Sequence, residues 1–179
     1  MLTVAPPDAV ELRANATFEA LMWALSRPGD IRDMPEAGFS AVVETLVDLE
    51  CTVFSDDPDL LAQIAAAGAL QAEDVSQADH VFLSSLEGVE ARLVALRCGS
   101  ALYPDDGATL VAAVRHGVGQ RVRLCGPGVD GTIEVTLDIA PGFWAMRAML
   151  CAYPEGFDML LVDGRSVIGI PRSTLVEVL

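Results

Sequence analysis

The chain has 179 residues, a length typical of one globular domain that buries its core without a disulfide or metal. Its 26 acidic residues outnumber its 11 basic residues, and the formal net charge of −15 repels the backbone of a nucleic acid. Hydrophobic residues make up 52% of the chain, yet no apolar run approaches the roughly 20 residues of a membrane span. We therefore expect a single domain over residues 1–179 that binds no nucleic acid and spans no membrane.

Two further features of the composition bear on location and chemistry. The four cysteines are scattered without a Cys-x-x-Cys pair, and no basic residue precedes an apolar run near the N-terminus. This pattern favours free thiols in a reducing cytoplasm and shows no sign of a secretory signal. All basic residues are arginine, so no lysine is available for a Schiff base to pyridoxal phosphate or for a phosphate-binding loop.

Helices and strands alternate in the first part of the chain and strands follow one another later. An apolar repeat over 18–25 predicts an amphipathic helix capped at Asn15 or Thr17 and ended by Pro28-Gly29. The elements expected after it are helices over 42–49, 58–68 and 141–151, an amphipathic stretch over 89–96, and strands over 51–55, 80–83, 109–114, 121–124 and 133–137. This order predicts an α/β fold with a mixed sheet and flanking helices.

The C-terminal segment predicts a β-hairpin. An apolar run over 157–162 is followed by Asp163-Gly164, a dipeptide that two-residue hairpin turns prefer because both central residues need a positive φ. Pro171 has no N–H to donate to a sheet, so it ends the second strand.

A short polar run at the exit of this hairpin is the leading candidate for an anion site. Arg172, Ser173 and Thr174 place a guanidinium beside two hydroxyls, a combination that suits phosphate. The alternative is a structural role at the strand end. Arg27 is a second candidate, although a basic side chain at a helix exit can simply complement the helix dipole. If Arg172 binds an anion, its substitution by alanine should abolish binding without lowering the melting temperature.

Trp144 and Arg147 are candidates for an interface. Arg147 interrupts an otherwise apolar helix, which indicates either an anchor for a partner or an internal paired charge. An exposed apolar helix at this place also predicts that the free chain forms a homodimer.

No catalytic constellation emerges from the sequence. His80 and His116 lack the spacing of zinc ligands, and the aspartates around Pro58 are typical of helix capping rather than of a cation site. The glycine-rich stretch 126–131 favours a turn over a phosphate loop. We assign no nucleophile and no metal site.

Five segments, in order along nearly the whole chain, resemble the PhnH family, the H subunit of the bacterial carbon-phosphorus lyase core complex. They cover residues 18–29, 45–53, 104–110, 124–129 and 153–174. Ser173 stands where the family usually has a threonine, which keeps a hydroxyl at that position. The resemblance implies a fold related to the large domain of pyridoxal-phosphate-dependent transferases but without the cofactor.

The resemblance also implies a function. With the PhnG, PhnI and PhnL subunits, and beside PhnJ in the core complex, the chain is expected to help couple methylphosphonate to the ribose of ATP. Adenine is released and ribose 1-methylphosphonate 5-triphosphate is formed. Two alternatives remain: a scaffold subunit of that complex with no ligand site, and an independent enzyme on a small acidic or phosphorylated substrate. The charge of −15 and the missing lysine disfavour the independent enzyme.

Overall fold

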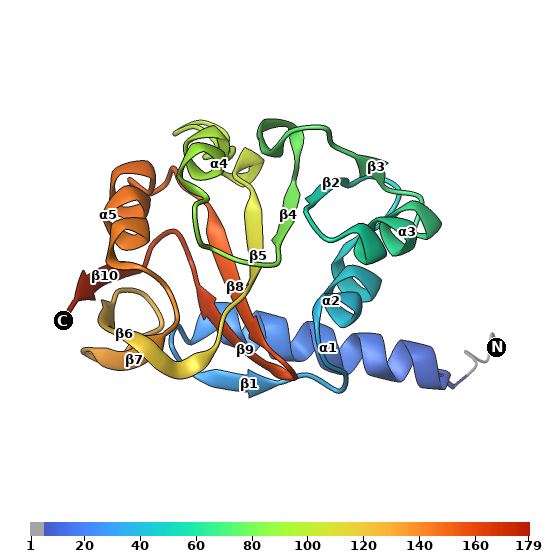
Figure 1. Cartoon of the computed structure of the whole chain (residues 1–179). Coiled ribbons are helices and arrows are strands. Elements are labelled where there is room, and N and C mark those ends of the chain that lie inside the picture. The colour runs from blue at the N-terminus through green and yellow to red at the C-terminus, as the bar shows by residue number, and fades with distance from the viewer. Residues whose placement is uncertain (1–5) are drawn as a thin grey trace.

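The structure is a computed structural model that describes residues 6–179 (Figure 1). Its centre is a seven-stranded mixed sheet in the order β1-β9-β8-β5-β4-β2-β3. The strands are β1 (Ile31–Asp33), β2 (Thr52–Ser55), β3 (Leu70–Gln71), β4 (His80–Leu83), β5 (Thr109–Ala113), β8 (Asp158–Asp163) and β9 (Ser166–Ile170). The five strands from β3 to β8 in this order pair in parallel, whereas β9 pairs antiparallel with β8 and with β1.

Both faces of this sheet are buried, because apolar residues on successive positions of each central strand point to opposite sides. On β5, Leu110 packs in the cluster that contains α4 and α5, and Val111 packs in the cluster that contains α1, α2 and α3. Because both faces are buried, the sequences of the parallel strands are continuous apolar runs. The helices are α1 (Ala9–Ser26), α2 (Phe39–Leu46), α3 (Pro58–Ala66), α4 (Glu90–Ala95) and α5 (Pro141–Leu150), with 3-10 turns at Val75–Gln77 and Pro104–Asp106.

A second, three-stranded antiparallel sheet packs with α5. It has the order β10-β6-β7, with β6 at His116–Cys125, β7 at Ile133–Leu137 and β10 at Leu175–Val178. Figure 1 shows this sheet and α5 together at one end of the molecule and α2 and α3 at the other. Val122, Leu124 and Leu137 extend one core cluster from the main sheet to this sheet.

Helix α1 lies close against β9, and a glycine makes that approach possible. A Cβ at Gly169 would stand 2.5 Å from the carbonyl oxygen of Ala24 and 2.6 Å from the nitrogen of Leu25. Backbone atoms cannot yield to such a contact as a flexible side chain can, so a residue without a Cβ is required here. The position of α1 on the sheet therefore depends on Gly169.

The predicted α/β fold with a mixed sheet and flanking helices is confirmed. Strands β4 and β7 have the predicted bounds, and α3, α4, α5, β2 and β5 lie within two residues of theirs. The pairing of β6, β7 and β10 in a separate sheet was not predicted, nor were the short strands β1, β3 and β10. These strands have few residues and half-exposed or exposed side chains, so they carry no distinctive apolar pattern.

Two predicted helix boundaries are wrong. Helix α1 begins at Ala9 and is capped by Asp8, whose Oδ1 accepts the N–H groups of Val10 and Glu11 at 2.9 Å, so Asn15 and Thr17 lie inside the helix. Helix α2 ends at Leu46 because Val47 is extended, which leaves Leu49 exposed.

The predicted apolar face of α1 is confirmed in part. Leu21 is buried and Leu25 packs against the core, but Phe18 and Met22 are 49% and 48% exposed. The other buried residues of α1 are the small Thr17, Ala20 and Ala24, because the helix lies so close to β9.

The turn of the C-terminal hairpin is displaced by one residue from the prediction. Asp163 pairs with Ser166, so the two central residues are Gly164 and Arg165, and only Gly164 has a positive φ, of 59°. Pro171 does end the second strand, as predicted. Within residues 6–179, no helix combines the length and the apolar character needed to cross a bilayer.

Candidate functional site

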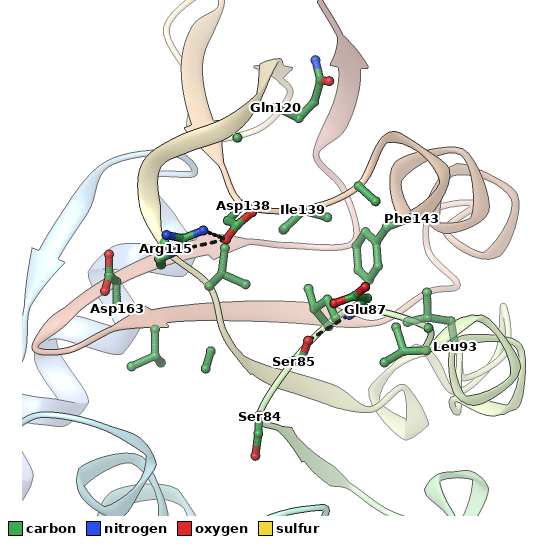
Figure 2. Close-up of a pocket in the computed structure, with 18 of the residues that line it drawn as sticks. Ser84, Ser85, Glu87, Leu93, Arg115, Gln120, Asp138, Ile139, Phe143 and Asp163 are labelled. Atoms are coloured by element: carbon green, nitrogen blue, oxygen red, sulfur yellow. Dashed lines mark hydrogen bonds and ion pairs between the residues drawn. The ribbon is translucent and has the colours of Figure 1, made fainter.

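A cavity of about 750 Å³ lies at the carboxyl ends of the parallel strands β4, β5 and β8 (Figure 2). We call it the carboxyl-edge pocket. Parallel α/β sheets bind ligands at this edge. The preferred place is beside two neighbouring strands whose following helices lie on opposite faces of the sheet. Here α3, which follows β2, packs in one core cluster and α4, which follows β4, packs in the other. The boundary between β2 and β4 is therefore such a point, and the pocket opens beside it.

The floor of the carboxyl-edge pocket is apolar. It is formed by Leu86 and Leu93 from the β4–α4 region, Val114 after β5, and Ile139 and Phe143 at the start of α5. All five side chains are buried, and Phe143 packs edge-on against Trp144 with ring centroids 5.3 Å apart. A rigid apolar floor of this kind favours ligands that have an apolar part.

The rim of the pocket carries four carboxylates and one guanidinium. The carboxylates belong to Glu87, Glu90, Asp138 and Asp163, and the guanidinium belongs to Arg115. Arg115 donates from Nε and Nη2 to Asp138 Oδ2 at 2.8 and 2.6 Å, an ion pair that Figure 2 shows on the side of the pocket away from Glu87. Three carboxylates thus lack a cationic partner among residues 6–179.

The loops around the pocket are tied together by side chains that follow the strands. Asp56, directly after β2, accepts the N–H and the hydroxyl of Ser84 at 2.7 and 2.9 Å and the Nη1 of Arg92 at 3.1 Å. Asp163 Oδ2 accepts the N–H of His116 at 2.9 Å. These bonds join the ends of β2 and β4, and the end of β8 and the start of β6, so the rim is held in a defined arrangement.

His116 is a half-buried imidazole beside the pocket. Its Nε2 lies 3.2 Å from the carbonyl oxygen of Leu161, so Nε2 carries the proton, and Nδ1 has no partner among the described residues. Burial lowers the pKa of His116 below its ordinary value, although Asp163 partly opposes this effect. The imidazole therefore gives the pocket no positive charge at neutral pH.

The predicted anion site lies at the opposite edge of the sheet. Arg172 follows β9 and faces Asp158, which begins β8, with Nη2 2.6 Å from Asp158 Oδ2 and Nε 3.2 Å from both carboxylate oxygens. Its Nη1 donates to the carbonyl of Pro104. Every nitrogen of this guanidinium, whose side chain is 13% exposed, thus has an internal partner. The anion role of Arg172 stays a prediction, and the ion pair is its structural alternative.

Ser173 and Thr174 do not form an open anion-binding site with Arg172. Thr174 is buried and its Oγ1 has no hydrogen-bond partner within residues 6–179, whereas Ser173 is half-buried. Arg27 lies at the C-cap of α1 with an exposed side chain, and its backbone N–H donates to the carbonyl of Trp23 at 2.9 Å. The four predicted anion ligands are therefore not brought together around one cavity of the described structure.

The two interface candidates are interior side chains. Trp144 and Arg147 are each 2% exposed on the face of α5 that meets the core and the chain end. Arg147 donates to the carbonyl oxygens of Pro171 and Thr174 at 2.7 and 3.0 Å, so its guanidinium holds the turn that leads into β10. Neither side chain is presented to a partner by the folded chain.

The described residues contain no group of three or more potential metal ligands. Asp57 caps α3 by accepting the N–H of Asp59 at 3.0 Å, which is the capping role expected from the sequence. The glycine-rich stretch 126–131 connects β6 to β7, as the turn prediction required.

The sequence profile described as bacterial phosphonate metabolism protein (PhnH) matches residues 8–177. The chain belongs to the PhnH family. The resemblance noted in its five segments is thereby confirmed over almost its whole length.

The names of two relatives of this PhnH-family chain describe them as subunits. The C-P lyase subunit protein HtxG of Stutzerimonas stutzeri is 33% identical over 172 residues, which cover 92% of this chain and 86% of the relative. The alpha-D-ribose 1-methylphosphonate 5-triphosphate synthase subunit PhnH of Rhizobium meliloti (strain 1021) is 27% identical over 186 residues, which cover 92% of this chain and 90% of the relative.

The sequence prediction for this family member missed the carboxyl-edge pocket. Its residues come from five separated segments that only the sheet order brings together. The one available signal was a polar residue directly after several predicted strands, such as Ser84, Arg115 and Asp163. That signal becomes meaningful only when the strands are known to be parallel neighbours.

Proposed function

We propose that the chain is a subunit of alpha-D-ribose 1-methylphosphonate 5-triphosphate synthase, a multi-subunit transferase of phosphonate catabolism. In this proposal it works with PhnG, PhnI and PhnL, beside PhnJ in the core complex, and helps to couple methylphosphonate to the ribose of ATP with release of adenine. The observation that carries the proposal is the family match over residues 8–177, together with the name of the Rhizobium meliloti relative.

The chain alone performs no chemistry in this proposal. Nucleophilic catalysis needs a hydroxyl or thiol within hydrogen-bond reach of a base. Within residues 6–179, neither His80 nor His116 makes a hydrogen bond to a hydroxyl or a thiol. This arrangement supports a division of labour in which the partner subunits contribute the reacting groups.

A second candidate function is a scaffold subunit without a ligand site. It is favoured by the internal partners of Arg172 and by the excess of carboxylates in the carboxyl-edge pocket. A triphosphate entering that pocket would face three uncompensated negative charges in a site partly shielded from water, which is unfavourable. Under this alternative, phosphate recognition belongs to other subunits.

We further propose that the fold is related to the large domain of pyridoxal-phosphate-dependent transferases and that it binds no such cofactor. The absence of lysine supports the second part, because that cofactor forms a Schiff base with a lysine amine. The cytoplasm is the proposed location, because the four cysteines are free thiols and ATP is the substrate of the complex.

We propose that the isolated chain forms a homodimer. The apolar helix on which this prediction was based, α5, buries Phe143 and Trp144 in the monomer and leaves Met149 76% exposed. A dimer that uses α5 therefore has to be built around Met149 and the half-buried Met146 and Leu150. Light scattering at micromolar concentration is expected to show a dimer, and a monomer would contradict the proposal.

Reconstitution tests the function. The partner subunits PhnG, PhnI and PhnJ are purified with and without this chain, PhnL is added, and adenine release from ATP and methylphosphonate is measured. Activity that requires the chain supports the subunit proposal. A chain that enters the complex without affecting adenine release favours the scaffold, and a chain that never enters the complex overturns both.

A further inference from the structure

We propose that the carboxyl-edge pocket receives a lysine or arginine side chain from a partner subunit of the complex. The proposal rests on the proposed function, because it needs a partner chain. It adds the place of contact and the chemistry of the residue that docks there.

The first argument is the unbalanced charge of the pocket. Glu87 and Glu90 come from the β4–α4 segment, and Asp163 comes from the end of β8, so carboxylates from separate parts of the chain converge on one cavity. Asp138 is neutralised by Arg115, but no cation among the described residues pairs with the other three. Exposed carboxylates around one cavity add their negative potentials there, and this potential attracts a cation.

The second argument is that residues 6–179 place no unpaired cation at the pocket. It contains no lysine, and the one guanidinium that lines the pocket donates from Nε and Nη2 to Asp138. His116 cannot replace it, because burial lowers the pKa of the imidazole. The missing positive charge has to come from another molecule.

The third argument is the shape of the cavity. Long basic side chains bury an apolar stem and keep the charged end near polar groups. The floor of Leu86, Ile139 and Phe143 offers an apolar surface for such a stem, and the rim places carboxylates at its end. Figure 2 shows Glu87 beside Phe143, with the N–H of Glu87 held by the Ser85 hydroxyl at 3.1 Å. Acidic rim and apolar floor together match lysine or arginine better than they match an anion.

The charge of the whole chain supports the same occupant. A net charge of −15 attracts basic surfaces and accelerates their approach, whereas it slows the approach of a free nucleotide or phosphonate. An acidic pocket at the sheet edge provides the place where a basic partner side chain is recognised after that approach.

Binding measurements with paired charge-neutralising variants test the proposal. The double variant Glu87→Gln/Asp163→Asn removes two pocket charges. The control Glu73→Gln/Asp105→Asn removes two charges from exposed residues that lie outside the pocket and have no ion-pair partner among residues 6–179. Each chain is titrated into the partner subunits purified without it, at about 50 and about 300 mM salt.

The pocket variant is expected to bind the partner subunits roughly tenfold more weakly than wild type at low salt and with a smaller salt dependence. The control variant is expected to stay within about twofold of wild type. Equal affinities of the pocket and control variants, with wild type binding normally, would overturn the pocket proposal and leave the subunit function intact. Failure of the wild-type chain to bind any partner would instead overturn the proposed function.

Carbodiimide crosslinking gives a second readout that locates the contact. Apart from the amino terminus, this lysine-free chain has no amine, so new amide bonds at its carboxylates come from amines of the partner subunits. Crosslinks that map to Glu87, Glu90 or Asp163 support a docked lysine. Crosslinks that map only to carboxylates elsewhere, together with unchanged affinity of the pocket variant, would exclude it.

Discussion

Asp158 and Arg172 form a part-buried ion pair at the amino ends of the parallel strands. Nη2 of Arg172 lies 2.6 Å from Oδ2 of Asp158, and Oδ1 of Asp158 accepts the backbone N–H of Arg172 at 2.8 Å. Hydrogen bonding to Asp158 raises the pKa of Arg172 above its ordinary value. One carboxylate thus joins the start of β8 to the residue that follows Pro171 after β9.

This ion pair changes the expected result of Arg172→Ala. The substitution should lower the free energy of unfolding by about 2 kcal/mol, because it leaves Asp158 part-buried without its cation and removes a donor from the carbonyl of Pro104. The exposed Arg27→Ala is the control and should change stability by less than about 0.5 kcal/mol. Urea unfolding compares the two. An unchanged unfolding midpoint for Arg172→Ala would favour the anion role predicted from the sequence.

Arg147→Met should be destabilising although methionine fills most of the same space. The carbonyl oxygens of Pro171 and Thr174 would both lose the guanidinium as a donor, and Pro171 would keep only the N–H of Thr174, at a cost of about 1 to 3 kcal/mol. Arg27→Met, the same substitution at an exposed arginine, is the matched control and should be nearly neutral. Thermal unfolding followed by circular dichroism measures both. Similar melting temperatures for the two variants would mean that the buried guanidinium does not hold the 171–174 turn.

Gly169→Ala should destabilise the chain by about 1 to 3 kcal/mol, because the new methyl group meets the backbone of α1 at Ala24 and Leu25. Gly142→Ala in α5 is a suitable control, since a Cβ there meets no atom within 4 Å and alanine favours the helix. Denaturant titration is expected to show loss of stability for the first and no loss for the second. Equal stability would show that α1 is free to move away from β9.

Lowering the pH should reduce the free energy of unfolding before the carboxylates titrate. Burial lowers the pKa values of His80 and His116 below the ordinary value of about 6.5, so the unfolded chain binds protons that the folded chain does not. The free energy of unfolding should therefore fall as the pH drops below about 6.5, until the lowered pKa values are reached. The urea midpoint at pH of about 7.5 and about 5.5 measures this slope.

The double variant His80→Gln/His116→Gln provides the control for that experiment. Glutamine does not titrate, so the fall in the urea midpoint between the two pH values should largely disappear. A double variant with the same fall as wild type would assign the acid sensitivity to other groups.

The sequence by itself determined the kind of fold and the family. Apolar periodicity places the long helices and the buried parallel strands, because burial of one helix face or of both sheet faces leaves a regular pattern. Helix α1 shows the limit of that pattern: Leu21 of its apolar repeat is buried, but Phe18 is exposed, and the close contact at Gly169 is made by small residues of the helix. The family resemblance rests on segments spread along the chain and did not depend on these details.

Only the tertiary structure decided which polar residues act together. Arg172 looked free beside two hydroxyls, but the fold places it against Asp158, 14 residues away in the chain, and buries Thr174. For Arg147 the sequence left a partner anchor and an internal pair open, and in the fold its guanidinium binds two carbonyl oxygens of its own chain. Strand order likewise assembles the carboxyl-edge pocket from distant loops. The physical reason is that charged groups interact through space, whatever their separation in the sequence. Apolar periodicity shows only the direction in which each side chain of an element points.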